Sequence, residues 1–133
     1  MQPEQFLGSF AEFGIWYTSD GHKGALSSEI RFEARGNDVV IHYEDGTRHI
    51  VAGAAVGFGR FPLAGDTASG WLYLGERTLI AEYTAKVDGQ EEHSLDVWTF
   101  DKDTVARSGI IRQAARTIWF EAAMERGSKE VDG

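Results

Sequence analysis

The sequence predicts a mainly all-β fold, an antiparallel up-and-down β-barrel of about eight strands with a short N-terminal helix. Turn signals recur along the chain, and between them lie runs of about 8 to 14 residues rich in β-branched and aromatic side chains. The turn signals are Asp20-Gly21, Gly36-Asn37, Asp45-Gly46, Gly75-Glu76 and Asp88-Gly89. Because Gly, Asn and Asp readily adopt the positive φ of tight hairpins, we expect each run to pair with the next in a meander.

The length and hydropathy of the chain predict a single soluble domain. The 133 residues fit one domain, and 42% hydrophobic residues suffice for a packed core. We expect this domain over residues 1–126 and a flexible tail over residues 127–133. Apolar runs are far shorter than the roughly 20 residues of a membrane span, and the N-terminus lacks the pattern of a signal peptide. The expected location is therefore the cytoplasm.

Charge and cysteine content exclude several classes of function. Thirteen Lys and Arg residues against 21 Asp and Glu residues give a net charge of −8, which argues against nucleic acid or an anionic membrane as the main partner. The absence of cysteine excludes disulfides, thiolate metal sites and cysteine nucleophiles. The four histidines show no metal-binding spacing, and nucleotide-binding motifs are lacking, so we expect neither a metal nor another cofactor.

Both ends of the chain carry apolar residues at helical spacing. Behind Pro3, phenylalanines recur at three- and four-residue intervals, which predicts the short helix over residues 3–13. Near the C-terminus, several alanines and Trp119 fit a helical period, while the alternation from Ile118 to Met124 fits a strand. The periodicity leaves residues 114–125 open between helix and strand.

A two-residue turn at Gly36-Asn37 places apolar side chains of two neighbouring strands on one face. The facing residues are Ile30, Phe32 and Ala34 on one strand and Val39, Ile41 and Tyr43 on the other. The opposite face is mostly charged. We therefore expect the apolar face to line the barrel interior.

Carrying this pairing through a turn at Asp45-Gly46 extends the interior along the next strand. The interior residues predicted there are Arg48, Ile50, Ala52, Ala54, Val56, Phe58 and Arg60. His42 and His49 become cross-strand neighbours on the outer face, without a third ligand at a recognisable spacing, so no metal site is predicted. The small side chains of this strand either leave a cavity or only allow the strand to curve.

In the second half of the chain, a two-residue loop at Asp88-Gly89 would mix the faces, so we expect a three-residue loop that ends at Gln90. The predicted interior residues are then Leu72, Leu74, Leu79, Ala81, Tyr83, Ala85, His93, Leu95, Val97 and Thr99, followed after a turn at Lys102-Asp103 by Ala106, Ser108, Ile110 and Arg112. The outer face carries Trp71, Tyr73, Ile80 and Trp98. Such an aromatic patch indicates either a homodimer or a cover formed by the C-terminal segment.

The polar residues among these interior positions suggest a binding function. Three inward arginines with few inward carboxylates favour a cavity that holds a small hydrophobic or aromatic molecule with an anionic end. The alternative is that Arg48 and Arg60 reach solvent at strand ends. The predicted ligand-binding residues are Tyr43, Arg48, Ile50, Ala52, Ala54, Val56, Phe58, Arg60, Tyr83, His93 and Arg112.

Two further functions stay open. A cofactor-independent lyase, isomerase or cyclase would use the same pocket, with His93 and Tyr83 as its catalytic pair. A purely structural dimer module would instead have its interior filled by aromatic side chains. The sequence alone does not decide whether the protein is an enzyme.

The segment Phe13-Gly14-Ile15-Trp16 opens the predicted first strand, after the aromatic helix and before the meander. In this arrangement and in its Gly-x-Trp motif, the chain resembles the calycin group of lipocalins and fatty-acid-binding proteins. The resemblance implies a barrel around a small hydrophobic ligand, with Trp16 beneath an arginine, either Arg112 or Arg116. It also implies His93 as a candidate haem ligand. The disulfide of the lipocalins and the Arg-x-Tyr clamp of the fatty-acid-binding proteins are missing, so the detailed ligand class does not transfer.

The segment Asp96–Asp101 and the following Val105-Ala106-Arg107 are similar to the closing hairpin of the steroid-isomerase-like cone, an α+β fold. That fold needs long N-terminal helices, whereas the strand pattern here begins near Gly14. The barrel is therefore the first interpretation and the cone the second.

Overall fold

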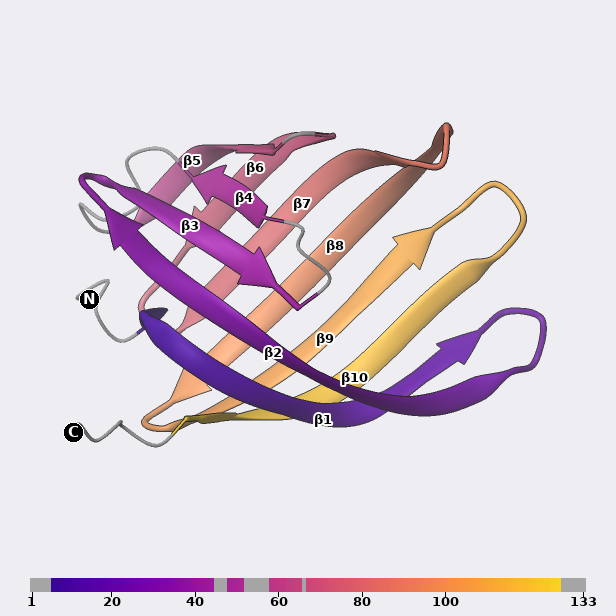
Figure 1. The fold of residues 1–133 in the computed structure, drawn as a ribbon, viewed down its shortest axis with the longest axis horizontal. Helices are drawn as coiled ribbons and strands as arrows, with labels where there is room; N and C mark the ends of the chain where they lie inside the picture. The colour runs from indigo at the N-terminus through magenta and orange to yellow at the C-terminus, as the bar shows by residue number, and fades with distance from the viewer. Residues whose placement is uncertain (1–5, 45–47, 52–57, 66, 128–133) are drawn as a thin grey trace.

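Ten antiparallel strands form a closed barrel in the computed structural model, which describes residues 6–44, 48–51, 58–65 and 67–127 (Figure 1). Each strand pairs with the next along the chain, and β1 also pairs with β10. The strands are β1 (Gly8–Thr18), β2 (Lys23–Arg35), β3 (Asp38–Tyr43), β4 (Arg48–Val51), β5 (Gly59–Gly65), β6 (Ala68–Leu74), β7 (Thr78–Val87), β8 (Gln90–Asp101), β9 (Thr104–Arg112) and β10 (Thr117–Arg126). The predicted up-and-down barrel is confirmed, with ten strands in place of about eight. The described residues contain no α-helix, so the α+β cone does not apply.

The two ends of the barrel are filled differently. The proximal end carries the start of β1 and the end of β10, and the distal end carries the β1–β2, β7–β8 and β9–β10 turns, at the right in Figure 1. Aromatic rings pack edge to face at the proximal end: Phe6 with Phe100 at 4.4 Å and Phe32 with Trp98 at 5.7 Å between centroids. Such pairs add about 0.5–1.5 kcal/mol beyond the area they bury. The proximal end is therefore a solid hydrophobic core.

Residues 8–13 belong to β1, so the helix predicted over residues 3–13 is wrong there, and residues 3–5 of that prediction lie outside the described residues. β1 pairs with β2 from Gly8 onward and with β10 from Phe10 onward. Its side chains alternate between the faces: Phe10 is fully buried, whereas Phe13 is 62% exposed. The helical spacing of the phenylalanines therefore arose from residues that lie on opposite faces of one strand.

The C-terminal segment is also a strand. β10 pairs with β9 and β1, and its side chains alternate, with Met124 fully buried and Trp119 42% exposed. The second of the two interpretations of residues 114–125 is thus the correct one from Thr117 onward.

Two of the predicted hairpin registers are confirmed. Across β2–β3, Phe32 pairs with Ile41, and both are buried; across β8–β9, Asp101 pairs with Thr104 around the predicted turn at Lys102-Asp103. On β6 and β7 the predicted faces are confirmed, since Leu72 and Ala81 point into the core. In the β2–β3 hairpin one face is uniformly apolar, which fixes the register.

The β3–β4 register differs from the prediction by one residue. His42 pairs with Arg48, and Ile41 pairs with His49, so the two histidines are not direct neighbours. The prediction placed Arg48 and Ile50 opposite the inward residues of β3, and the structure does not have this pairing. The predictions for Ala52, Ala54 and Val56 lie outside the described residues.

The β7–β8 register also differs by one residue, and this reverses the faces of β8 and β9. Asp88 and Gly89 have φ values of 52° and 78°, as a two-residue type I′ turn requires, so no three-residue loop forms. The predicted interior residues His93, Leu95, Val97, Thr99, Ala106, Ser108, Ile110 and Arg112 consequently belong to the outer face. Their neighbours Ser94, Asp96, Trp98, Phe100, Val105, Arg107, Gly109 and Ile111 point inward. Trp98, predicted on the outer face, is fully buried.

Gly14 allows a close approach between β1 and β10. A Cβ atom at this position would lie 2.6 Å from the Cα of Ala122 on β10, closer than real Cβ atoms pack. By contrast, a Cβ at Gly75 would make one ordinary contact, 3.7 Å from the carbonyl oxygen of Thr78. The glycine of the Gly14-x-Trp16 motif is therefore required by strand packing.

We expect Gly14→Ala to lower the free energy of unfolding by about 1–3 kcal/mol, because the new methyl group must displace backbone. Gly75→Ala is the matched control and should change it by less than about 0.5 kcal/mol. Urea unfolding followed by circular dichroism measures both. Equal stability of the two variants would contradict the close approach.

Candidate ligand-binding cavity

The distal end of the barrel contains a cavity of about 370 Å³, referred to below as the apolar lobe. Its lining residues are Trp16, Thr18, Leu26, Arg107, Ile111, Arg116, Ile118 and Phe120. A second hollow of about 230 Å³, the polar lobe, shares Arg107 and Ile111 with it. The other lining residues of the polar lobe are Tyr43, Thr67, Ala68, Tyr83, Ala85, Val87, Glu92 and Ser94. The interior thus changes from a solid core at the proximal end to an open lumen at the distal end.

Two aromatic rings line the apolar lobe without filling it. A Cβ at Gly24 would collide with the ring of Trp16, and a Cβ at Gly109 would collide with the ring of Phe120. Each ring therefore lies against the barrel wall, over a glycine of the neighbouring strand. The absence of a side chain at these two positions keeps the rings out of the centre of the lumen.

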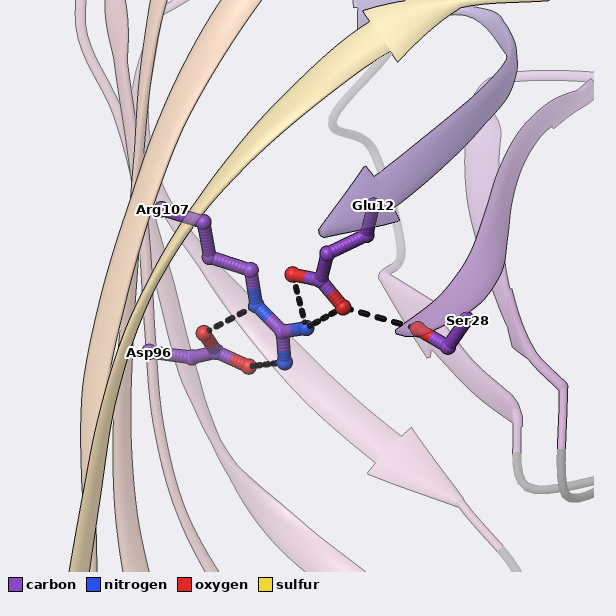
Figure 2. Close-up of polar contacts among 4 residues, drawn as sticks. All are labelled: Glu12, Ser28, Asp96 and Arg107. Atoms are coloured by element: carbon purple, nitrogen blue, oxygen red, sulfur yellow. Dashed lines mark hydrogen bonds and ion pairs between the residues drawn. The ribbon is translucent and has the colours of Figure 1, made fainter. Parts of the chain in front are cut away.

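A buried ion-pair network lies between the core and the cavity (Figure 2). Arg107 on β9 donates from Nε and Nη2 to the two carboxylate oxygens of Asp96 on β8, at 2.8 and 2.6 Å. Its Nη1 donates to both oxygens of Glu12 on β1, at 2.9 and 2.7 Å. Ser28 on β2 donates to Glu12 at 2.7 Å, so the network joins four strands.

The network lies almost entirely out of solvent. The side chain of Glu12 is 0% exposed, that of Asp96 is 5% exposed and that of Arg107 is 10% exposed. Ala122 on β10 pairs with Arg107 on one side and with Gly14 on the other. These two small residues leave room for the arginine side chain to reach across β10 to Glu12.

One guanidinium faces two carboxylates, so with all three groups ionised the network carries one net negative charge. Burial raises the pKa of Asp96, and this effect outweighs the opposing charge of Arg107. For Arg107, burial alone would lower the pKa, but the charge of Asp96 and its hydrogen bonds raise it. The arginine therefore stays charged, and the network favours the addition of a proton over the addition of an anion.

Two tyrosines on the wall of the polar lobe remain neutral at physiological pH. Burial raises the pKa of Tyr83 to about 12, with a further increase from the charge of Asp96. Burial also raises the pKa of Tyr43 well above its ordinary value. Both phenols can therefore act as hydrogen-bond donors.

The structure brings together only part of the predicted site. Tyr43 and Tyr83 line the polar lobe, as their predicted inward positions require. Phe58 is 69% exposed, so its predicted interior position is wrong. Arg60 is exposed too, with its guanidinium carbon 3.5 Å from the ring centre of Trp71 on the outer surface. Arg112 is likewise exposed, at the end of β9.

The predicted catalytic pair lies on opposite faces of the sheet. His93 is exposed and its Nδ1 lies 3.1 Å from the hydroxyl of Thr84, whereas Tyr83 faces the lumen. The one-residue shift between β7 and β8 separates the two side chains. For the same reason, His93 cannot serve as the axial ligand of a haem in the lumen.

Sequence reasoning missed the three charged residues of the network. Each follows the alternation of its strand, but the two-residue loop at Asp88-Gly89 was rejected because it places Glu82 opposite Leu95, which is the pairing that the structure has. The signal that would have found them is joint: the Lys102-Asp103 turn places Asp96 and Arg107 on the same face, and the two-residue turn at Asp88-Gly89 directs that face inward. A buried carboxylate next to a buried arginine is a much smaller cost than either group alone.

Within the described ranges, no group of three His, Cys, Asp or Glu side chains could hold a metal ion. In the same part of the chain, no helix has the length and apolar character needed to cross a membrane.

The barrel has a counterpart among solved structures. It is similar to the crystal structure of Rv2717c from M. tuberculosis, with a TM-score of 0.65, 14% sequence identity, and coverage of 93% of this chain and 94% of that chain. No family profile and no curated protein matches the sequence. The resemblance to the calycin group thus extends to a β-barrel, and membership of that group is not shown.

We expect Arg107→Met to lower the free energy of unfolding by about 3–5 kcal/mol at neutral pH, because two buried carboxylates lose their counter-charge. Arg112→Met, on the outer face of the same strand, should change it by less than about 0.5 kcal/mol. Without the guanidinium, the pKa of Asp96 rises further above its ordinary value of 3.8. A carboxyl group with a raised pKa in the folded state stabilises the fold at low pH, and this stabilisation is lost as pH rises. The loss in free energy of unfolding caused by Arg107→Met should therefore become smaller toward about pH 4. Urea unfolding at several pH values tests this, and a pH-independent deficit would contradict it.

We expect Tyr83 to titrate late when phenolate absorbance is followed in the folded protein. Its pKa of about 12 lies above the ordinary value of 10.0, so its stabilising effect is complete below pH 10 and is lost as pH rises through about 12. Tyr83→Phe should remove a component of the titration with a midpoint near this value. The same titration in denaturant is the control, where no such late component is expected. If Tyr83→Phe instead removed a component near the ordinary value of 10.0, the phenol would lie outside the lumen.

Proposed function

We propose that this protein binds a small hydrophobic or aromatic molecule in the lumen at the distal end of the barrel. The observation that supports this most directly is the apolar lobe, where Leu26, Ile111 and Ile118 face an open space of about 370 Å³. Ligand cavities commonly span about 300–1,000 Å³ and combine an apolar wall with a few polar groups. The two lobes fit this description.

The charges around the lumen favour one orientation of the ligand. At the inner boundary of the lumen, Arg107 is already neutralised by Asp96 and Glu12, and the network carries an excess negative charge. An anionic group placed there would meet like charge in a low-dielectric site. The apolar part of the ligand therefore enters first.

Arg116 is the residue that favours an anionic end on the ligand. It belongs to the turn between β9 and β10 and lines the apolar lobe at the distal end. Its Nε donates to the side-chain oxygen of Gln113 at 3.3 Å, a long hydrogen bond that a carboxylate can replace. Arg116 thus replaces Arg48, Arg60 and Arg112 as the residue proposed to contact the anionic end of the ligand.

The polar lobe adds hydrogen-bonding capacity at the side of the apolar lobe. Tyr83 and Ser94 line it, together with Tyr43. Their neutral hydroxyl groups suit a hydroxyl or carbonyl group of the ligand, or ordered water. Glu92 also lines this lobe, where its carboxylate accepts a hydrogen bond from the side chain of Gln113 at 2.7 Å, so this part of the lumen suits a neutral polar group better than an anion.

Isothermal titration calorimetry with dodecanoate and dodecanol tests the proposal. We expect both probes to bind the wild-type protein, and we expect Ile111→Trp to abolish binding of both because the added ring fills the junction of the lobes. Ile110→Trp is the matched control on the outer face of the same strand and should leave binding intact. Absence of binding of both probes to wild type, or equal binding to the two tryptophan variants, would contradict a ligand in the lumen.

The position of the anionic end is tested separately. Arg116→Gln should weaken dodecanoate binding about tenfold, the effect of about 1.4 kcal/mol from one charge-assisted contact, and leave dodecanol unchanged. Arg112→Gln is the control and should change neither affinity. Equal losses for acid and alcohol in Arg116→Gln would show that the arginine acts through packing and not through charge.

A further inference from the structure

The two lobes of the lumen lie side by side along β9. They share Arg107 and Ile111, inward residues of this strand that are separated by about 13 Å along its length. From β9 the apolar lobe extends over β10, β1 and β2, whereas the polar lobe extends over β8 and β7. A ligand that occupies both lobes therefore meets an apolar wall along one long edge and a polar wall along the other.

The apolar wall is suited to a flat ring system. Three atoms of the Trp16 indole would lie at 3.0 Å or less from a Cβ atom at Gly24, so the indole lies across this glycine. One face of the indole thus covers the backbone of β2, and the other face lines the lobe. Trp16 is only half-buried, as are Leu26 and Ile118 on the neighbouring strands. An aromatic ligand can stack on this indole face.

The polar wall presents several hydrogen-bond donors. Burial keeps the phenols of Tyr43 and Tyr83 protonated, because it raises the pKa of both groups. Ser94, the cross-strand partner of Tyr83, adds a third hydroxyl group. Arg107 adds a further donor, since its Nη2 carries two N–H groups and makes one hydrogen bond among the described residues, to Asp96. This edge of the lumen therefore suits a hydrogen-bond acceptor.

Only the arginine of the ion-pair network lines the lumen. Arg107 contributes to both lobes, whereas Asp96 and Glu12 contribute to neither. A ligand therefore meets the donors of the network, while the excess negative charge behind them disfavours an anion. Glu92 disfavours it further, because its carboxylate lines the polar lobe and accepts a hydrogen bond from Gln113 at 2.7 Å. A neutral acceptor, such as a carbonyl group, suits this edge best.

With the lumen as the ligand site proposed above, we propose that its ligand is a flat aromatic acid with a carbonyl group on one long edge. The ring system stacks on the indole of Trp16. The carbonyl oxygen accepts a hydrogen bond from Tyr83 on the opposite wall. The carboxylate lies at the distal end of the lumen, beside Arg116.

Isothermal titration calorimetry with fluorene-2-carboxylate and 9-fluorenone-2-carboxylate tests the proposal. The two acids have the same three-ring skeleton and the same carboxylate, and only the second carries a carbonyl group on one edge. We expect the wild-type protein to bind the ketone about fivefold more tightly, and we expect Tyr83→Phe to abolish this preference by weakening the ketone alone. Tyr73→Phe is the matched control, because the phenol of Tyr73 donates to Glu82 at 3.0 Å on the outer face.

Equal affinity of the wild-type protein for the two acids, or a Tyr83→Phe variant that keeps the preference for the ketone, would overturn the proposal. Infrared spectroscopy of the bound ketone keeps the test decisive if Tyr83→Phe fails to fold. In the wild-type complex, the carbonyl stretching frequency should lie below its value in hexane, as a hydrogen-bonded carbonyl requires. A frequency equal to that in hexane would contradict the contact with the polar wall.

The stacking on the apolar wall is tested with a second pair of variants. Trp16→Leu should weaken both three-ring acids about fivefold, with a smaller effect on dodecanoate, which has no ring to stack. Trp119→Leu is the control, because Trp119 is exposed on the outer face of β10. If Trp16→Leu changed the affinity for neither three-ring acid, the flat orientation against the indole would be wrong.

The chemistry of the ligand rests on the proposed function, and the probes separate the two. If dodecanoate binds in the lumen and neither three-ring acid binds, the lumen is a ligand site but its ligand is not a flat aromatic acid. If dodecanoate, dodecanol and both three-ring acids all fail to bind, the proposed function itself is wrong.

Discussion

The ion pairs of Arg107 tie the barrel together where its core ends and its lumen begins. The guanidinium holds Asp96 on the neighbouring β8 and reaches across β10 to Glu12 on β1. It also lies over the ring of Phe120, 4.7 Å from the ring centre, so a wall residue of the lumen packs on the network. Because a buried charge without its partner is very costly, these strands cannot change register independently of one another. The network thus fixes the arrangement from which both the lumen and the outer surface follow.

The network also separates two different tasks along the barrel. At the proximal end, Phe10, Phe32 and Phe100 fill the space between the strands and supply hydrophobic stabilisation. At the distal end, Gly24 and Gly109 let aromatic rings lie on the wall, and the lumen stays open. A continuous apolar interior could collapse onto this space, whereas a layer of fixed charges resists it. The stability of the proximal end therefore permits an open distal end.

How much of the strand register could be predicted from the sequence depended on how strongly the two faces of each strand differ in polarity. The hairpin around Gly36-Asn37 has one apolar and one charged face, and its register followed from the sequence. In β8, both sets of alternating residues contain apolar side chains, so the pattern did not select a face, and the two-residue loop was rejected because it pairs Glu82 with Leu95, as the structure does. The Lys102-Asp103 turn then carried the wrong face of β8 on to β9, with Asp96 and Arg107 together on the outside. The shift leaves the faces of β7 unchanged and reverses those of β8, which explains why Tyr83 was placed correctly and its supposed partner His93 was not.

The observed register between β7 and β8 has a cost in hydrophobic burial. It leaves Leu95 and Ile110 on the outer wall, whereas the register predicted from the sequence would have turned both toward the interior. Full burial of such a side chain contributes about 1.5–3 kcal/mol, so exposing two of them offsets part of what the network contributes. In an isolated barrel this is an unfavourable exchange, since buried ion pairs by themselves add little stability. What the exchange provides is a fixed layer of charges between the core and the lumen, where the guanidinium of Arg107 also packs on the ring of Phe120. The arrangement of β8 and β9 therefore gives up hydrophobic stabilisation on the outer face and keeps the boundary of the lumen in place.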